Sequence, residues 1–397
     1  MYLRRQFLEN IAGTSDIPQA FCPVKGSGSY LYDIDGRAFL DLISGFCVNN
    51  LGHSHPAIVE AIQEQSSKYL HTNVYGEHIQ LPQVQLAQFL CSLLPSNLQS
   101  IYYLNSGSEV IDAAIKLSRK ATGRSEIIVC SNAYHGSTLA AESLRSDFEH
   151  SAAYRPLLPN IRFIQANNLK DLEKISKNTA AVITEVVQAE AGVKILNNEF
   201  LKGLRDKCTE TNSLLVFDEI QTGFGRTGSL FAFQKTAVIP DILLVGKSFG
   251  FGLPLSGLVT SKELFDEFKN NPSLGYLSTF GGNPLCCATA FAGLKALLAE
   301  KIMDGIPNLV KVVKEELTSP LIKEIRAQGM LIAIDLGNKE LVWKLIQELF
   351  NKNLLVESFL FDHGSLRLTP PLNIKEDELR QACRIINEQI IKSSEVK

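Results

Sequence analysis

The sequence lacks several features that would assign it to a specialised class. No apolar run approaches the ~20 residues needed to cross a bilayer, and the first residues contain no apolar h-region of a secretory signal. The eight cysteines include no C-x-x-C pair, and the net charge is only −3. These absences argue against a zinc site, a disulfide framework and attraction to nucleic acid or anionic membranes. We therefore expect a cytoplasmic protein with no metal, nucleic-acid or membrane partner.

The chain has the apolar content of a soluble globular protein, with 45% hydrophobic and 20% charged residues among 397. From about residue 100, helical patterns separate many of its short apolar runs. The runs cover residues 101–104, 126–130, 161–164, 180–187, 214–217, 242–245 and 258–259. This alternation predicts an α/β fold whose mostly parallel sheet is covered by helices on both faces.

The two ends of the chain have a different pattern. Alternating apolar and polar residues around Asp35 and Gly36 predict a β-hairpin. Further helices are expected at 81–94, with Leu81, Val84, Ala87, Leu90 and Leu94 buried, and at 288–300, 306–318, 339–353 and 375–392, with strands at 330–336 and 365–369. We predict a large domain over residues 51–287, and a smaller α+β domain made from residues 1–50 and 288–397.

Lys247 follows the apolar run Ile242 to Val245 after the single residue Gly246, and it precedes a glycine-rich stretch. A lysine at the carboxyl end of a buried strand is partly desolvated, which lowers its pKa and prepares it to form a Schiff base. On this stretch alone, a solvated lysine in a turn is the better interpretation. Three other strand ends change that interpretation.

The first strand end precedes Gly107 and Ser108, which open a helix that could hold a phosphate, although a simple capping box of Ser106 and Glu109 is the alternative. Asp218 ends a central strand and could pair with a protonated ring nitrogen. Tyr134 follows a third strand and could stack on a planar ligand. Together with Lys247, these residues are the parts that pyridoxal phosphate requires of a protein.

The same residues lie in motifs that resemble the class III pyridoxal-phosphate aminotransferases, which include acetylornithine, ornithine and 4-aminobutyrate aminotransferases. The motifs are N-S-G-S-E-V (105–110), F-D-E-I-Q-T-G-F-G-R-T-G (217–228), G-K-S (246–248) and S-T-F-G-G-N-P-L (278–285). The resemblance runs from about Asp33 to Glu378. It implies fold type I of the pyridoxal-phosphate-dependent transferases, with a seven-stranded sheet, and a homodimer with shared active sites.

The resemblance also implies roles for individual residues. Lys247 resembles the Schiff-base lysine that shuttles the proton, and Asp218 the partner of the ring nitrogen. The other expected cofactor contacts are Gly107, Ser108, Tyr134, His135, Glu185, Gln221 and, from the neighbouring subunit, Thr279. Arg367 resembles the arginine that holds the keto-acid carboxylate, and Glu190 the glutamate that gates it.

Two positions depart from the pattern of the ornithine and acetylornithine enzymes. Ser137 stands where they usually carry an arginine that clamps the donor's distal carboxylate, and Phe46 where ornithine enzymes have a tyrosine. A serine cannot replace a bidentate guanidinium. We therefore expect a donor that lacks this carboxylate, such as an ω-amine or diamine, unless Arg145 restores the clamp.

The sequence thus predicts an aminotransferase that moves an amino group from an ω-amine or amino acid to a keto acid such as 2-oxoglutarate. One alternative is a lyase, racemase or aminomutase with the same cofactor. Another is an ordinary acetylornithine aminotransferase with an altered clamp. A third is a cofactor-binding protein without catalysis, or a structural dimer, against which the joint presence of Lys247, Asp218 and Arg367 argues.

Overall fold

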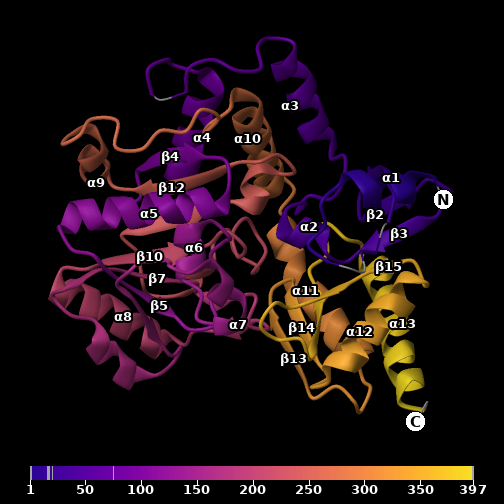
Figure 1. Ribbon diagram of the computed structural model, residues 1–397. Coiled ribbons are helices and arrows are strands. Elements are labelled where there is room, and N and C mark those ends of the chain that lie inside the picture. The colour runs from indigo at the N-terminus through magenta and orange to yellow at the C-terminus, as the bar shows by residue number, and fades with distance from the viewer. Residues whose placement is uncertain (1, 16–17, 20, 75, 396–397) are drawn as a thin grey trace.

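The computed structural model describes residues 2–15, 18–19, 21–74 and 76–395 (Figure 1). Its largest sheet has seven strands in the order β4-β12-β11-β10-β7-β5-β6. Their bounds are Ser100–Leu104 (β4), Glu126–Cys130 (β5), Ile161–Ile164 (β6), Thr179–Thr184 (β7), Leu214–Asp218 (β10), Ile242–Val245 (β11) and Ser256–Thr260 (β12). Within this sheet, β12 is the one strand that runs opposite to the direction shared by all the others. The predicted mostly parallel, seven-stranded sheet is confirmed.

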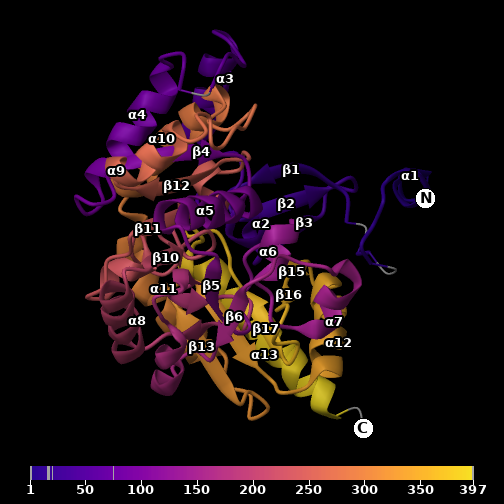
Figure 2. The same cartoon turned by 60° about the vertical axis from the view of Figure 1, so that its left-hand side comes forward.

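Helices cover both faces of this sheet because alternate strand residues point to opposite sides. Ile127 and Val129 of β5 pack in one apolar cluster with α5 (Gly107–Thr122). Ile128 and Cys130 of the same strand pack in the other cluster. That cluster also contains residues of α4 (Leu81–Ser92), α8 (Asn198–Thr211) and α10 (Pro284–Ala299). In both views α3 (Pro56–Ser66), α4 and α10 lie together at the top (Figures 1 and 2).

Two details of the sequence prediction were wrong. The predicted strand 180–187 ends at Thr184, because the chain turns so that the Glu185 carboxylate accepts a hydrogen bond from the Ala189 amide. The next strand, β8 (Val187–Gln188), pairs with β9 (Lys194–Ile195) in a separate sheet. On α4, Leu81 and Val84 are exposed, while Pro82, Leu86 and Leu90 are buried. The helix is apolar on more than one side, so periodicity alone did not identify its buried face.

Strands from both ends of the chain share one small sheet, β1-β2-β3-β15. Its strands are Pro23–Ser27 (β1), Tyr30–Asp33 (β2), Ala38–Asp41 (β3) and Leu354–Leu355 (β15), and β2 and β3 form the predicted hairpin. Figure 1 shows β2 and β3 beside the C-terminal part of the chain. The domain boundaries stay a prediction, and the position 287/288 lies inside α10.

A second small sheet, β13-β14-β17-β16, lies in the C-terminal part. Its strands are Glu324–Gln328 (β13), Leu331–Asp335 (β14), Glu357–Ser358 (β16) and Ser365–Leu368 (β17). The nearby helices are α11 (Ile302–Glu316), α12 (Lys339–Phe350) and α13 (Glu376–Glu395). On α13, the side chains of Leu379, Cys383, Ile386 and Ile390 follow one another at helical spacing and are fully buried.

The remaining elements are short or peripheral. They are α1 (Tyr2–Asn10), α2 (Ser44–Cys47), α6 (Leu139–Ser143), α7 (Phe148–Ser151), α9 (Lys262–Phe265) and the 3₁₀ turns η1 (Ala152–Tyr154), η2 (Leu169–Lys174), η3 (Ala232–Lys235), η4 (Lys247–Gly250) and η5 (Asp266–Lys269). Within the described residues, no helix combines the length and apolarity needed to cross a membrane.

Candidate active site

A cavity of about 190 Å³ lies at the carboxyl ends of the parallel strands, where ligands bind in sheets of this kind. It is lined by Ser106, Gly107, Ser108, Tyr134, His135, Gly136, Glu185, Asp218, Ile220, Gln221 and Lys247. Each of these residues ends, or lies shortly after, β4, β5, β7, β10 or β11. The structure therefore brings together all the cofactor contacts expected from the sequence except Thr279, which does not line this cavity.

Lys247 enters the cavity directly after β11, from a left-handed backbone conformation with φ of +49°. Its Nζ donates a hydrogen bond to Oε1 of Gln221. Burial lowers the pKa of Lys247. The lysine is thus a partly buried, activated amine, and not the solvated turn residue of the alternative interpretation.

Asp218 and His135 form a buried pair that the sequence prediction missed. Nδ1 of His135 lies 2.7 Å from Oδ2 of Asp218, and Oδ1 of Asp218 accepts a hydrogen bond from the Ile220 amide at 3.0 Å. Both side chains are almost fully buried. The pairing fixes the orientation of the carboxylate, which lines the cavity. Its sequence signal was that Asp218 ends one strand of the sheet and His135 lies shortly after the end of another.

Glu185 also lines the cavity and is buried. Its burial, and then the nearby negative charge of Asp218, raise the pKa of this carboxyl well above its usual value. Oε1 of Glu185 accepts a hydrogen bond from the Ala189 amide at 3.1 Å, while Oε2 has no partner among the described residues. Burial and the charge of Asp218 thus favour the protonated form of this carboxyl, which can donate as well as accept a hydrogen bond.

The N-terminus of α5 forms another wall of the cavity. Both halves of the capping box between Ser106 and Glu109 are present, so the capping interpretation is confirmed without removing Gly107 and Ser108 from the cavity. Ser108 Oγ accepts a hydrogen bond from the Ser137 amide at 3.0 Å. A Cβ atom on Gly136, whose φ is +131°, would lie 2.1 Å from this Oγ. The backbone therefore packs closely around a helix N-terminus, which favours anions.

A second cavity, of about 410 Å³, lies on the other side of Lys247 and Tyr134. It is lined by Phe46, Tyr134, Glu190, Lys247, Trp343, Glu357, Ser358, Phe359, Leu360, His363 and Arg367. Lys247 and Tyr134 line both cavities. Of the residues in this wall, the sequence prediction named Phe46, Tyr134, Glu190, Lys247 and Arg367. It missed those at 343–363 because their contribution depends on the packing of α12 and β16.

Arg367 and Glu190 form a buried ion pair in this second cavity. Oε1 of Glu190 also accepts a hydrogen bond from Nε2 of Gln221 at 3.2 Å. Burial would raise the pKa of Glu190, but the charges of Arg367 and Lys247 lower it on balance. Nε and Nη1 of Arg367 are buried without a partner among the described residues, so the guanidinium keeps donors for a second anion.

Phe46 is held against Arg367 by an unusual turn. Ser44, Gly45, Phe46 and Cys47 have φ values of +47°, +61°, +58° and +67°, which non-glycine residues rarely adopt. The guanidinium carbon of Arg367 lies 5.3 Å from the ring centroid of Phe46 and 4.4 Å from the ring centroid of Phe359. The two rings thereby limit the movement of the arginine.

A buried arginine supports this turn. Arg226 donates through Nη2 to Ser44 Oγ and Asn50 Oδ1, and through Nη1 to the carbonyl oxygens of Met330 and Pro370. Thr369, two residues after Arg367, also bonds to this segment through its amide and hydroxyl. The network therefore ties the N-terminal turn to the end of β17.

Ser137 and Arg145 do not form a carboxylate clamp. The Ser137 hydroxyl lies 3.0 Å from the Tyr134 hydroxyl. Arg145 pairs with Asp147 at 2.8 Å and lies 3.7 Å from Glu142. It lines neither cavity, so it does not restore the clamp in this conformation.

The first cavity fits pyridoxal phosphate. It offers an anion-binding helix N-terminus, the buried carboxylate of Asp218, the ring of Tyr134 in its wall and the amine of Lys247 with its lowered pKa. His135 Nε2 and Glu185 Oε2 are buried polar atoms without a partner among the described residues, as expected where a polar ligand completes the contacts. Among those residues, no group of three or more His, Cys, Asp or Glu side chains could hold a metal ion.

Comparison with known proteins agrees with this chemistry. The family model described as aminotransferase class-III matches residues 12–390, so the chain belongs to that family. The acetylornithine aminotransferase of Clostridium acetobutylicum is 37% identical, over 92% of this chain and 95% of its own. The ornithine aminotransferase structure from Toxoplasma gondii ME49 has a TM-score of 0.91 at 28% identity, covering 100% of this chain and 96% of the other.

A third relative acts on another substrate. The adenosylmethionine-8-amino-7-oxononanoate aminotransferase structure from Methanocaldococcus jannaschii has a TM-score of 0.91 at 26% identity, covering 98% and 99% of the two chains. This chain is a pyridoxal-phosphate-dependent class III aminotransferase. Relatives with the same fold are named for different substrates. The fold therefore does not determine the amino donor, which depends on the residues of the second cavity.

Proposed function

We propose that the chain moves an amino group from an ω-amine or amino acid donor to a keto acid such as 2-oxoglutarate. The observation that carries this proposal is that Lys247 lines both the cavity with Asp218 and the cavity with Arg367. One cavity suits the cofactor and the other suits the substrate. When bound, the cofactor supplies an electron sink for the carbon that loses its proton and carries the amino group between the two substrates.

Lys247 holds the cofactor and, once the donor amine has displaced it, moves the proton at the reacting carbon. Burial lowers the pKa of Nζ, which favours the uncharged amine that a proton-transferring base requires. Gln221 accepts a hydrogen bond from this Nζ and so orients it. Proton removal and return by one amine suits a transaminase, in which the proton leaves one atom and arrives at another.

The other residues of the first cavity hold the cofactor. Asp218, fixed by His135, keeps a proton on the ring nitrogen, and Tyr134 packs on the ring. Gly107 and Ser108 hold the phosphate at the start of α5. Glu185, whose Oε2 atom has no partner among the described residues, would hold a polar substituent of the ring.

Arg367 binds the keto-acid carboxylate, and Glu190 covers Arg367 while an amine donor is bound. The ion pair neutralises Arg367 in the donor half of the reaction. An arriving carboxylate competes with Glu190 for the guanidinium donors, which include the unpaired Nε and Nη1. One site thus accepts a donor without a carboxylate and an acceptor with one.

Borohydride reduction of the loaded protein tests the cofactor site. The label should appear on the peptide that contains Lys247, and a label on another lysine would contradict the assignment.

Addition of the amino donor to the loaded protein without a keto acid separates the reaction classes. A transaminase accumulates the pyridoxamine form of the cofactor, whereas a lyase, racemase or aminomutase returns the starting spectrum.

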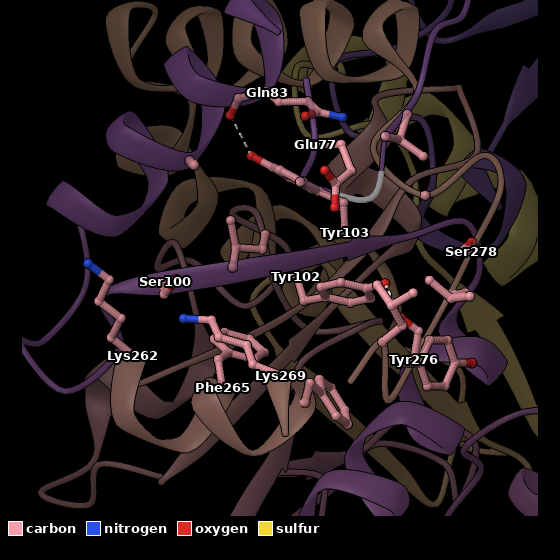
Figure 3. A pocket seen from close by; sticks show the side chains of 18 of the residues that line it. Glu77, Gln83, Ser100, Tyr102, Tyr103, Lys262, Phe265, Lys269, Tyr276 and Ser278 are labelled. Atoms are coloured by element: carbon pink, nitrogen blue, oxygen red, sulfur yellow. Dashed lines mark hydrogen bonds between the residues drawn. The ribbon is translucent and has the colours of Figure 1, made fainter. Parts of the chain in front are cut away.

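We also propose a homodimer in which Thr279 reaches the phosphate of the neighbouring subunit. Thr279 is exposed and lines neither cavity of its own chain. It adjoins Ser278 in the wall of a groove of about 600 Å³, where Tyr102, Tyr103 and Tyr276 lie (Figure 3). Around this groove the apolar side chains of Ile79, Leu81, Val84, Leu274, Leu277 and Phe280 are exposed. Such an apolar surface is typical of an obligate interface.

Sedimentation velocity tests the dimer at assay concentrations. Val84→Lys combined with Leu277→Lys, two exposed positions that line the groove, should produce monomers with little activity, whereas Ile239→Lys, at an exposed apolar position outside the lining of the groove, should not. An active monomer would contradict the shared site.

We further propose a cytoplasmic location. All eight cysteines are free thiols, which suits a reducing compartment. Cell fractionation checks this, and recovery of the protein outside the cytoplasm would contradict it.

A further inference from the structure

The second cavity contains one carboxylate that the proposed reaction does not use. Glu357 lies on β16, and in the antiparallel pair of β16 with β17 it stands directly opposite Arg367. Opposite residues in such a pair point to the same face of the sheet, with Cβ atoms about 5 Å apart. Both residues line the cavity. The Glu357 carboxylate therefore borders the space into which substrates enter.

The charges in this cavity do not balance once the cofactor is bound. Glu190 already matches the charge of Arg367 through their ion pair, and Lys247, once the donor has displaced it from the cofactor, acts as an uncharged base. Glu357 has no ion-pair partner in the described part of the chain, and its Oε1 only accepts a hydrogen bond from the Ser358 amide at 3.0 Å. An unmatched negative charge remains beside the donor.

Two exposed aromatic rings line the same space. Trp343 on α12 is 48% exposed and Phe46 is 44% exposed. Indole has the strongest attraction for an ammonium among the aromatic side chains, and both rings can pack on a methylene chain. Rings and an unmatched carboxylate in one cavity are the elements of a site for an alkyl ammonium ion.

We propose that Glu357, with Trp343 and Phe46, binds the distal ammonium of the amino donor, and that the donors are short aliphatic diamines. This inference rests on the proposed transaminase function, because it assigns the end of the donor that does not react. It agrees with Ser137, which removes the clamp for a distal carboxylate. The same carboxylate weakens the binding of the dianionic acceptor, since it repels a second negative charge beside Arg367.

Steady-state kinetics of the holoenzyme with two matched donors test the proposal. The donors are 1,4-diaminobutane and butylamine, which differ by one ammonium group, and both are measured at pH 8. The parent should prefer the diamine by about tenfold in kcat/KM. Glu357→Gln should remove most of this preference through KM, at an unchanged kcat, and should lower the KM for 2-oxoglutarate. Glu340→Gln, an exposed position on α12, is the charge-matched control and should change neither.

Opposite shifts for the diamine and the keto acid are not expected from a merely structural role. The proposal would be overturned if Glu357→Gln lowered kcat/KM equally for both amines, or if its preference for the diamine were unchanged. Should Glu357→Gln fail to fold, Trp343→Leu must reduce the diamine preference instead, and an unchanged preference there overturns it too. A parent that turns over N-acetylornithine but neither amine refutes the inference and leaves the aminotransferase intact. A loaded parent that converts no donor refutes the proposed function itself.

Discussion

The two cavities that meet at Lys247 are built in different ways. Residues of the cofactor cavity follow strands of one parallel sheet, whose backbone ladder fixes their spacing. The substrate cavity combines the turn at Phe46, the loop at Glu190, α12 and the pair of β16 with β17. One hydrogen-bonded framework determines the first cavity, whereas the packing of segments hundreds of residues apart determines the second. We therefore expect the first cavity to define the cofactor chemistry and the second to define the substrate.

The largest effect should come from the cofactor cavity. Asp218→Asn removes the charge that keeps the ring nitrogen protonated while preserving the shape of the side chain. We expect kcat to fall by about 10²–10³-fold, the usual cost of losing one preorganised electrostatic partner. Preserved melting temperature and cofactor loading serve as the controls. A kcat within tenfold of the parent would contradict the role of Asp218.

A smaller and more selective effect should come from the substrate cavity. Arg367→Ala should raise the KM for 2-oxoglutarate by about 10–100-fold, because a charge-assisted contact to the carboxylate is lost. The KM for an amine donor should change little. Removal of Arg367 also leaves Glu190 unpaired, so the double variant with Glu190→Gln separates the two causes. An equal increase in KM for the amine and for the keto acid would show that the two cavities are not distinct in function.

The smallest effect concerns a carboxyl group beside the cofactor cavity. Burial, opposed by hydrogen bonds from Thr222, Ala232 and Phe233, raises the pKa of Glu219 from 4.5 to about 7. The folded state therefore keeps this proton between pH 4.5 and 7, where the unfolded chain releases it. The stability contributed by Glu219 is fully present at low pH and is lost as the pH rises toward 7.

Glu219→Gln should remove that pH dependence. The melting temperature of the parent minus that of the variant should be largest near pH 5 and should shrink by pH 8, at one protein concentration. A constant difference across this range would argue that Glu219 titrates normally.

Sequence patterns predicted the sheet and the cofactor cavity well because both follow from local rules. Short apolar runs marked the strands, and the residues after them met at one edge, as the parallel sheet requires. The contact between His135 and Asp218 was missed, since no local pattern specifies which residues at that edge pair with each other.

The substrate cavity was predicted only where a motif marked it. Phe46, Glu190 and Arg367 were found through the family resemblance, but Trp343 and Glu357 have no such motif. Their positions depend on the register of β16 against β17 and on α12 packing nearby, which are long-range contacts. Arg226 differs from them because it lies in the motif at 217–228, but its four partners come from segments around residues 44, 50, 330 and 370, which no local pattern specifies.

The account depends most on the claim that the second cavity accepts a donor without a distal carboxylate. Steady-state kinetics of the holoenzyme on 1,4-diaminobutane and on N-acetylornithine, with 2-oxoglutarate as acceptor, test this most directly. We predict efficient turnover of the diamine and weak or no turnover of N-acetylornithine, since neither Ser137 nor Arg145 offers its carboxylate a cationic partner in the cavity. A kcat/KM for N-acetylornithine of ~10⁴ M⁻¹s⁻¹ or more would contradict the claim and identify an ordinary acetylornithine aminotransferase.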